Sequence, residues 1–222
     1  MRSYLTITLL VLSSAVGAQD MQGLLARVRA RIAQVNDYSA EARMKIDVSF
    51  MKVPESAVKV YFKKPDQFRI IKEGGISILP KGGVTISLAA LLSGNDFAAI
   101  DAGRENGLQV IKLVPLKETG DIALTTLYID DKALLVKRAV TTTRNNGTYE
   151  LSLEYGNYAS LALPDRAVFT FNTSGYKLPK GLALEYDAGA ANAPAAPSGK
   201  GQVILVYQRY TVNKGVPETV FK

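Results

Sequence analysis

Few side chains in this sequence are suited to catalysis. The 222 residues include no Cys and no His, so the chain lacks a thiol nucleophile, the commonest general base and the commonest transition-metal ligand. Ser56 and Lys59 match the Ser-x-x-Lys spacing of some serine acylases. That chemistry needs both side chains on one helical turn, but here they begin a predicted strand, where residues three apart face opposite sides. We therefore expect no nucleophilic site at Ser56.

Two pairs of carboxylates could in principle do acid–base or metal chemistry. Glu150 and Glu154 share one face of a predicted strand, but they alternate with Leu151, Leu153 and Tyr155, which indicates a solvated outer face rather than a general acid–base pair. Asp130-Asp131 could contact a cation, but a hairpin turn explains it better. We therefore do not expect an enzyme, and we expect no metal and no cofactor.

The first eighteen residues have the pattern of a secretory signal peptide. Arg2 is followed by a mostly apolar run from Leu5 to Leu12, and small residues at Val16-Gly17-Ala18 precede Gln19. This run is too short for a membrane-spanning helix, although a buried N-terminal helix is an alternative. No Cys follows the expected cut to receive a lipid. We expect residues 1–18 to be removed and residues 19–222 to form a single soluble, exported domain.

The chain is basic, with a formal net charge of +7 at pH 7. Nucleic acid is not an expected partner, because an exported protein rarely meets any. Anionic lipid surfaces are more plausible partners for such a charge. Solubility alone is the alternative explanation, since the Lys and Arg residues are scattered along the chain.

Hydrophobic periodicity predicts one helix followed by many strands. Apolar residues recur at helical spacing from Asp20 to Asn36, and from Tyr38 to Phe50 they alternate with polar residues, as in a strand with one dry face. Further strands are expected at Ala57–Lys63, Gln67–Lys72, Leu108–Leu113, Ile122–Ile129, Leu134–Thr142, Thr148–Tyr158, Arg166–Phe171 and Val203–Val212. Short turn signals, among them Asn146-Gly147, separate them and imply an antiparallel meander.

One apolar segment interrupts the strands. Ile86 to Gly94 is expected to be a short apolar helix ended by glycine, Asn95 to Ala102 a second short helix, and Asp187 to Gly201 a flexible loop. An apolar helix between strands of one sheet must lie on its dry face, because it is too short to be stable alone. The predicted fold is mainly β (α+β): a curved antiparallel half-barrel sheet, with an N-terminal helix and short lid helices over its concave face. Composition leaves open whether these helices fill that face or enclose an apolar cavity.

The segment from Ala57 to Ile71 is the most informative. Two strands flank Lys64-Pro65-Asp66, which must be a turn, because Pro cannot donate to a ladder and forces the preceding residue to be extended. Counting by two places Phe62 and Lys64 on the inner face, with Lys64 at its rim, and Phe68 returns to that face from the next strand. The segment is therefore expected to form the wall of an apolar cavity.

In order and spacing the chain resembles the LolA family of periplasmic lipoprotein carriers. The resemblance rests on the helix, the strand starting Tyr38-Ser39-Ala40, the Lys64-Pro65 turn and Phe68-Arg69. It is extended by Val114-Pro115-Leu116, by Leu127-Tyr128-Ile129-Asp130 and by the ending from Tyr210 to Phe221. It implies an incomplete antiparallel barrel, closed by helices, that binds acyl chains in its cavity. The chain departs from the family in having Lys64 where Arg is typical, in lacking Trp, and in the segment Gly74 to Gly83.

The resemblance favours a ligand cavity over a solid core between the sheet and the Ile86–Leu92 helix, with roughly a few hundred Å³ of space. The expected cavity and lid residues are apolar, with Lys64 at the rim: Met44, Ile46, Val60, Phe62, Phe68, Ile70, Leu88, Leu91 and Leu92. For the three leucines a fixed core helix is an equal alternative to a movable lid.

Two functions follow from the resemblance. The first is a monomeric periplasmic carrier that binds acyl chains of lipoproteins or other lipids and moves them toward the outer membrane, with an inner-membrane donor complex and an outer-membrane acceptor as candidate partners. The second is a lipid-sensing or interaction module on the same fold that docks to an envelope partner.

The signal-peptide pattern gives a direct test. We expect the protein recovered from an export-competent bacterium to begin at Gln19 and to fractionate with soluble envelope proteins. N-terminal sequencing that finds Met1, or fractionation with integral membrane proteins, would contradict this expectation.

Overall fold

The computed structural model describes residues 15–48, 51–52, 54–72, 88, 92, 97–117, 121–145, 147–172 and 199–221. One long helix, α1 (Ala15–Ile32), precedes the strands. The strands are β1 (Asp37–Val48), β2 (Met51–Lys52), β3 (Ser56–Lys63), β4 (Gln67–Lys72), β5 (Phe97–Glu105), β6 (Leu108–Pro115), β7 (Ile122–Asp130), β8 (Leu135–Thr143), β9 (Thr148–Glu154), β10 (Arg166–Asn172) and β11 (Lys200–Val212). Two 3₁₀ helices, η1 (Ala159–Leu161) and η2 (Glu218–Phe221), complete the described elements.

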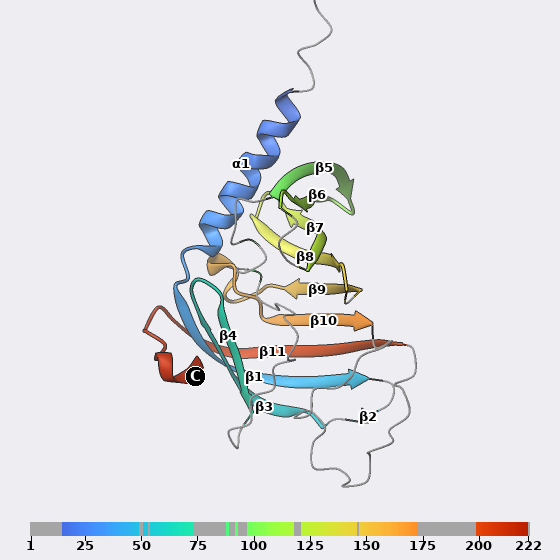
Figure 1. Ribbon diagram of the computed structural model, residues 1–222. Coiled ribbons are helices and arrows are strands. Elements are labelled where there is room, and N and C mark those ends of the chain that lie inside the picture. Colours follow the sequence, from blue (N-terminus) through green and yellow to red (C-terminus); the bar gives the residue numbers. More distant parts are fainter. Residues whose placement is uncertain are drawn as a thin grey trace, which may run out of the picture.

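The strands form one open, curved antiparallel sheet (Figure 1). Their order is β4-β3-β1-β11-β10-β9-β8-β7-β6-β5, with β2 paired to β1. The run from β6 to β10 is the predicted meander, because each strand pairs with its sequence neighbour, and β5 extends it at the edge of the sheet. The C-terminal strand β11 then lies between β10 and β1, so it connects the meander to the N-terminal strands of the sheet. The predicted fold class is therefore confirmed.

One face of the sheet is dry. Along β1 the side chains at Tyr38, Ala40, Ala42, Met44 and Val48 are buried, and those between them are mostly exposed. The register carries this alternation across the sheet. Tyr38 pairs with Phe62 of β3, and Ala40 pairs with Tyr210 of β11. Helix α1 packs against β5 and runs beside the β5–β8 part of the sheet (Figure 1), burying Met21, Leu24, Leu25 and Val28. The core thus lies between α1 and the dry face.

A β-bulge in β11 changes which side chains reach the dry face. Ala42 pairs with Tyr207 and Glu41 with Arg209, so the register shifts around Gln208. Residues three apart in a regular strand face opposite sides, but the extra residue brings both Tyr207 and Tyr210 to the inner face. Their rings stack with centroids 4.9 Å apart.

Polar contacts fix the α1–β1 junction and the C-terminal segment to the sheet. Asn213, which follows β11, accepts a hydrogen bond from the backbone N–H of Asn36 (2.7 Å) and donates one to the carbonyl of Gln34 (2.9 Å). At the β4 edge, the Arg69 side chain donates to the carbonyl of Val220 (2.5 Å), so η2 lies against that strand. The junction of α1 and β1 and the C-terminus are therefore both held at this side of the sheet.

Three expected elements differ from the structure. The helix expected from Asp20 to Asn36 begins at Ala15 and ends at Ile32. The predicted helix from Asn95 to Ala102 is wrong, because β5 occupies Phe97–Glu105 and pairs with β6. Asn106 and Gly107 have φ of 50° and 81°, the positive values that a two-residue type I′ hairpin turn requires. The strand predicted to reach Tyr158 ends at Glu154, and a turn and η1 follow.

Three further expectations fall largely outside the described residues. Of the Ile86–Gly94 helix, only Leu88 and Leu92 are described, and both are helical. Residues 1–14 of the expected signal peptide and residues 187–198 of the expected loop also lie outside. Within the described residues, no helix is long and apolar enough to cross a membrane.

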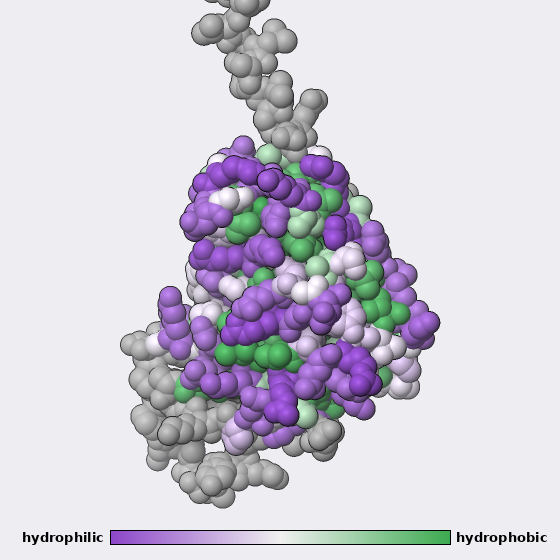
Figure 2. All heavy atoms as spheres, turned by 180° about the vertical axis from the view of Figure 1, so that it is seen from behind, coloured by the Kyte–Doolittle hydropathy of each residue, from purple (hydrophilic) through white to green (hydrophobic). Residues whose placement is uncertain are grey.

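The outer surface is mostly polar. Seen from behind, polar side chains cover most of the molecule and small apolar patches interrupt them (Figure 2). Among the described residues, the exposed large apolar side chains are Ile100, Leu116 and Val206. The larger apolar groups are otherwise gathered on the concave side, where α1 and the pocket described below lie.

A close approach at Gly201 gives a test of this packing. A Cβ atom there would lie 2.7 Å from Phe171 Cζ and 2.9 Å from Val48 Cγ1, whereas a Cβ at Gly23 of α1 would meet nothing within 4 Å. We expect Gly201→Ala to lower the free energy of unfolding by about 1–3 kcal/mol through overpacking. Gly23→Ala should leave it unchanged or raise it by about 0.5–1 kcal/mol. Urea denaturation measures both, and equal effects of the two substitutions would contradict this packing.

Candidate functional site

An apolar pocket lies on the dry face near the C-terminal end of α1. Strands β1, β3, β4, β9, β10 and β11 contribute to its wall, together with residues after α1 and the loop that contains η1. The described lining residues are Ile32, Val35, Tyr38, Phe62, Phe68, Leu88, Leu151, Leu153, Tyr155, Leu161, Ala162, Leu163, Pro164, Ala167 and Tyr207. None of them carries a formal charge.

The pocket is smaller than the sequence analysis predicted. Its volume is about 70 Å³, whereas ligand pockets usually hold roughly 300–1,000 Å³. The apolar side chains of α1, the η1 loop and Leu88 fill much of the concave face. The pocket formed by the described residues is therefore a small cavity on the dry face.

The predicted site residues divide into three groups. Phe62, Phe68 and Leu88 line the pocket, and Phe62 pairs directly with Phe68 across β3 and β4. Four others are buried in the core but do not line the pocket: Met44, Val60, Ile70 and Leu92. Ile46 is half-buried and packs against this core. Leu91 lies outside the described residues. A ligand-binding role for each of the nine stays a prediction.

Lys64, predicted to lie at the rim, contacts the residues that directly follow α1. Its Nζ donates hydrogen bonds to the carbonyl of Ala33 (2.5 Å) and to Asn36 Oδ1 (2.9 Å), and its backbone N–H donates to the carbonyl of Asn36 (2.9 Å). The last carbonyls of a helix lack partners within the helix, and a cation there is favourable. Lys64 therefore fixes the β3–β4 turn to the end of α1.

Arg31 connects α1 to the loop that contains η1. Its Nη2 donates to the carbonyl of Ala159 in η1 (3.0 Å), and the next residue along α1, Ile32, lines the pocket. Two cations thus connect the end of α1 to the two loops that flank the pocket.

Tyrosines supply most of the polar atoms of the pocket, and sequence reasoning did not select them. Tyr38, Tyr155 and Tyr207 line it. Burial raises the pKa of each hydroxyl, and for Tyr38 the neighbouring Tyr207 raises the pKa further. These phenols are therefore neutral hydrogen-bonding groups across the physiological pH range. The signal for Tyr207 was the consecutive polar pair Gln208-Arg209, which interrupts the alternation of β11.

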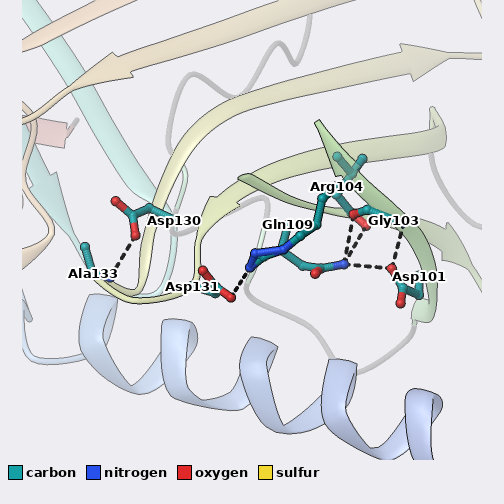
Figure 3. A network of polar contacts seen from close by, with 8 residues as sticks. Asp101, Gly103, Arg104, Gln109, Asp130, Asp131 and Ala133 are labelled. Atoms are coloured by element: carbon teal, nitrogen blue, oxygen red, sulfur yellow. Dashed lines mark hydrogen bonds and ion pairs between the residues drawn. The ribbon is translucent and has the colours of Figure 1, made fainter. Parts of the chain in front are cut away.

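The carboxylates considered for catalysis have structural partners on the surface. Glu150 accepts a hydrogen bond from Arg138 Nη2 (2.9 Å), and Glu154 pairs with Arg166. At the β7–β8 turn, Asp130 Oδ1 accepts from the backbone N–H of Ala133 (2.9 Å). Asp131 pairs with Arg104, and the hydrogen bond from Arg104 lowers the pKa of Asp131 (Figure 3). These contacts agree with a solvated outer face and a hairpin turn.

The remaining candidates for chemistry are also separated. Ser56 is half-buried and Lys59 exposed on β3, and Ser56 Oγ donates to the carbonyl of Pro54 (3.2 Å). Among the described residues there is no group of three or more His, Cys, Asp or Glu that could hold a metal ion. The pocket can therefore exclude water and bind apolar groups, but its described side chains offer no general acid, base or nucleophile for catalysis near neutral pH.

Comparison with known proteins shows a LolA-like fold. No protein-family model matches the chain, and no curated protein matches it. Among solved structures, a LolA superfamily protein from Nitrosomonas europaea has a TM-score of 0.56 at 9% identity, with 91% of this chain and 97% of that chain covered. A domain assigned to outer membrane lipoprotein sorting, from Vibrio parahaemolyticus, has a TM-score of 0.59 at 10% identity, with 92% and 97% covered.

A third similar structure is a DUF1329 family protein from Desulfovibrio piger, with a TM-score of 0.53, 12% identity and coverage of 92% and 97%. At such low identity these likenesses establish the fold alone. The fold expected from the Lys64-Pro65 turn and the later segments is thereby confirmed.

The contacts of Lys64 give a prediction about stability. Lys64→Met removes the hydrogen bonds of Nζ to Ala33 and Asn36 but keeps an unbranched chain, so we expect the free energy of unfolding to fall by about 0.5–1.5 kcal/mol. Lys64→Arg should retain the wild-type value, because a guanidinium offers more donors to the same carbonyls. Lys59→Met, on the exposed face of β3, is the control and should change stability by less than about 0.5 kcal/mol. Indistinguishable melting curves for Lys64→Met and Lys59→Met would show that the rim contact does not stabilise the fold.

Proposed function

We propose that this protein is a periplasmic carrier that binds acyl chains of lipoproteins or lipids against the dry face of its sheet and moves them toward the outer membrane. The observation that carries the proposal is the uncharged apolar pocket between the concave face, the end of α1 and Leu88. A LolA-like fold and the predicted signal peptide support the same function. In this proposal the ligand is held by burial of apolar surface, which is favourable by roughly 0.8 kcal/mol for each buried CH₂ group.

A cavity of about 70 Å³ cannot enclose an entire long acyl chain. Binding therefore requires displacement of side chains that now fill the concave face. Leu88 is well placed for this, because it lines the pocket and does not belong to a strand of the sheet. We propose that the acyl chain takes the place of the Leu88 side chain against Phe62 and Phe68.

The proposal is tested by the lipids that the protein carries and by their transfer. Protein purified from its own periplasm should contain lipid or lipoprotein, detected by native mass spectrometry and released by solvent extraction. The loaded protein should then deliver this lipid stoichiometrically to acceptor vesicles. Retention of the lipid in the presence of acceptor vesicles would favour the sensing module over the carrier, and absence of any lipid and of fatty-acid uptake would contradict both.

Phe68 provides a variant for the same assay. Phe68→Glu places a carboxylate in an apolar pocket, where an unpaired charge is costly, and we expect uptake of a fluorescent fatty acid to fall at least about tenfold. Ala57→Glu is the matched control, because it adds the same side chain at an exposed position of β3, opposite Arg43. Thermal unfolding of both variants is measured first, so that lost binding is not confused with lost folding. Equal uptake by the two folded variants would place the ligand elsewhere.

A further inference from the structure

Lys137 of β8 has its ammonium group on the dry face of the sheet. It is the extra residue of a β-bulge, since its neighbours Val136 and Arg138 both have register partners in β7 and Lys137 has none. Its Nζ lies over the ring of Tyr155, 5.1 Å from the ring centroid. Tyr155 lines the pocket. The cationic end of Lys137 therefore lies beside the pocket wall, although Lys137 is not itself one of the described lining residues.

The position of Lys137 along its strand agrees with this contact. Ala139 pairs with Leu151 of β9, and both side chains are buried. The intervening Arg138 points to the outer face, where its Nη2 lies 2.9 Å from Glu150 Oε2. Side chains two apart in a strand share a face. Lys137 thus shares the face of Ala139 and of Leu151, which lines the pocket.

The charge of Lys137 is not compensated in the part of the chain that the structure describes. There the adjacent Arg138 has Glu150 as an ion-pair partner, but no carboxylate pairs with Lys137. The ring of Tyr155 attracts the ammonium without neutralising it. Lys137 is also half-buried, and taking an ammonium out of water is costly unless an opposite charge compensates it. An anion beside this wall would supply that charge.

We infer that Lys137 binds the anionic headgroup, a carboxylate or a phosphate, of an acyl chain held in the pocket. This inference rests on the proposed function, since it assigns a headgroup class to the same pocket. The flexible four-carbon stem of lysine lets the ammonium move from the ring of Tyr155 to an anion beside it. The acyl chain then lies along Leu153 toward Phe62 and Phe68, with its headgroup at the β8 side. Among the ligands of the proposed carrier, Lys137 therefore favours lipids with an anionic headgroup.

Matched ligands of one chain length test this inference by competition with a neutral fluorescent probe, N-phenyl-1-naphthylamine. Dodecanoate and dodecyl phosphate are each compared with dodecanol at one ionic strength, and the affinity ratio of anion to alcohol is measured for each protein. Lys137→Met keeps an unbranched chain but removes the charge, so the ratios should fall about 3- to 10-fold, as expected for one half-buried ionic contact. A fall for one anion alone also supports the inference and identifies the headgroup. Lys137→Arg keeps the charge and should leave the ratios within about twofold of the wild-type values.

Lys112→Met is the matched control. Lys112 is exposed on β6 between the buried Ile111 and Leu113, so its loss changes the net charge equally and should leave the ratios unchanged. Thermal unfolding of all variants is measured first, and Lys137→Gln replaces Lys137→Met if the latter does not fold. In a further arm, acetate and inorganic phosphate are added at constant ionic strength. They should not reduce the preference for the anionic ligands, because without an acyl chain nothing holds them beside the ammonium.

The outcomes separate this inference from the proposed function. Equal ratios in the wild-type protein and in the folded Lys137→Met protein overturn the inference and leave the carrier function intact. An equal fall in Lys137→Met and Lys112→Met also overturns it, because net charge would then explain the preference. Loss of the preference on addition of acetate or inorganic phosphate overturns it as well, since the site would then bind free anions. Failure of the wild-type protein to bind the probe and all three ligands overturns the proposed function itself.

Discussion

The dry face of the sheet is the constraint on which this structure depends. An antiparallel sheet with one apolar face must cover that face, since exposing it would forfeit the main favourable term in folding. Helix α1 covers the β5–β8 part through residues such as Leu25 and Val28, which are almost completely buried. Over the other part of the sheet the cover consists of shorter pieces, among them the η1 loop and Leu88. The pocket lies where these pieces meet.

The polar contacts follow from the same constraint. The cover is short and local, so it is fixed at its margins by hydrogen bonds to backbone carbonyls rather than by a second sheet. Lys64 and Arg31 join the end of α1 to the two flanking loops, and Asn213 joins it to the end of β11. Inside, the buried phenols of Tyr210 and Tyr155 donate to the backbone carbonyls of Pro164 and Val136, because a buried polar group needs a partner. A bulge at Gln208 brings Tyr207 and Tyr210 to one face.

Regular alternation made much of the fold predictable from the sequence. The period of two from Tyr38 onward identified the dry face, and Pro65 located the turn that pairs Phe62 with Phe68. Local exceptions to this period were harder to predict from the sequence. Asn106-Gly107 was a hairpin signal that was overlooked, so β5 was taken for a helix, although its Ala-rich sequence is compatible with either. Tyr207 was missed because a one-residue bulge reverses the face of everything beyond it. The size of the pocket depends on how side chains from distant segments fill space, which no local pattern encodes.

The small volume of the pocket sets the energetics of the proposed carrier. An acyl chain gains free energy when its methylene groups leave water, but it must first displace apolar side chains that already make close contacts in the empty protein. The two terms oppose each other, so the net affinity is lower than the buried area of the ligand suggests. In the proposed carrier, a displaced Leu88 side chain also has an apolar pocket to return to when the ligand leaves. Covering the dry face both with and without ligand would suit a protein that takes up an acyl chain and then releases it.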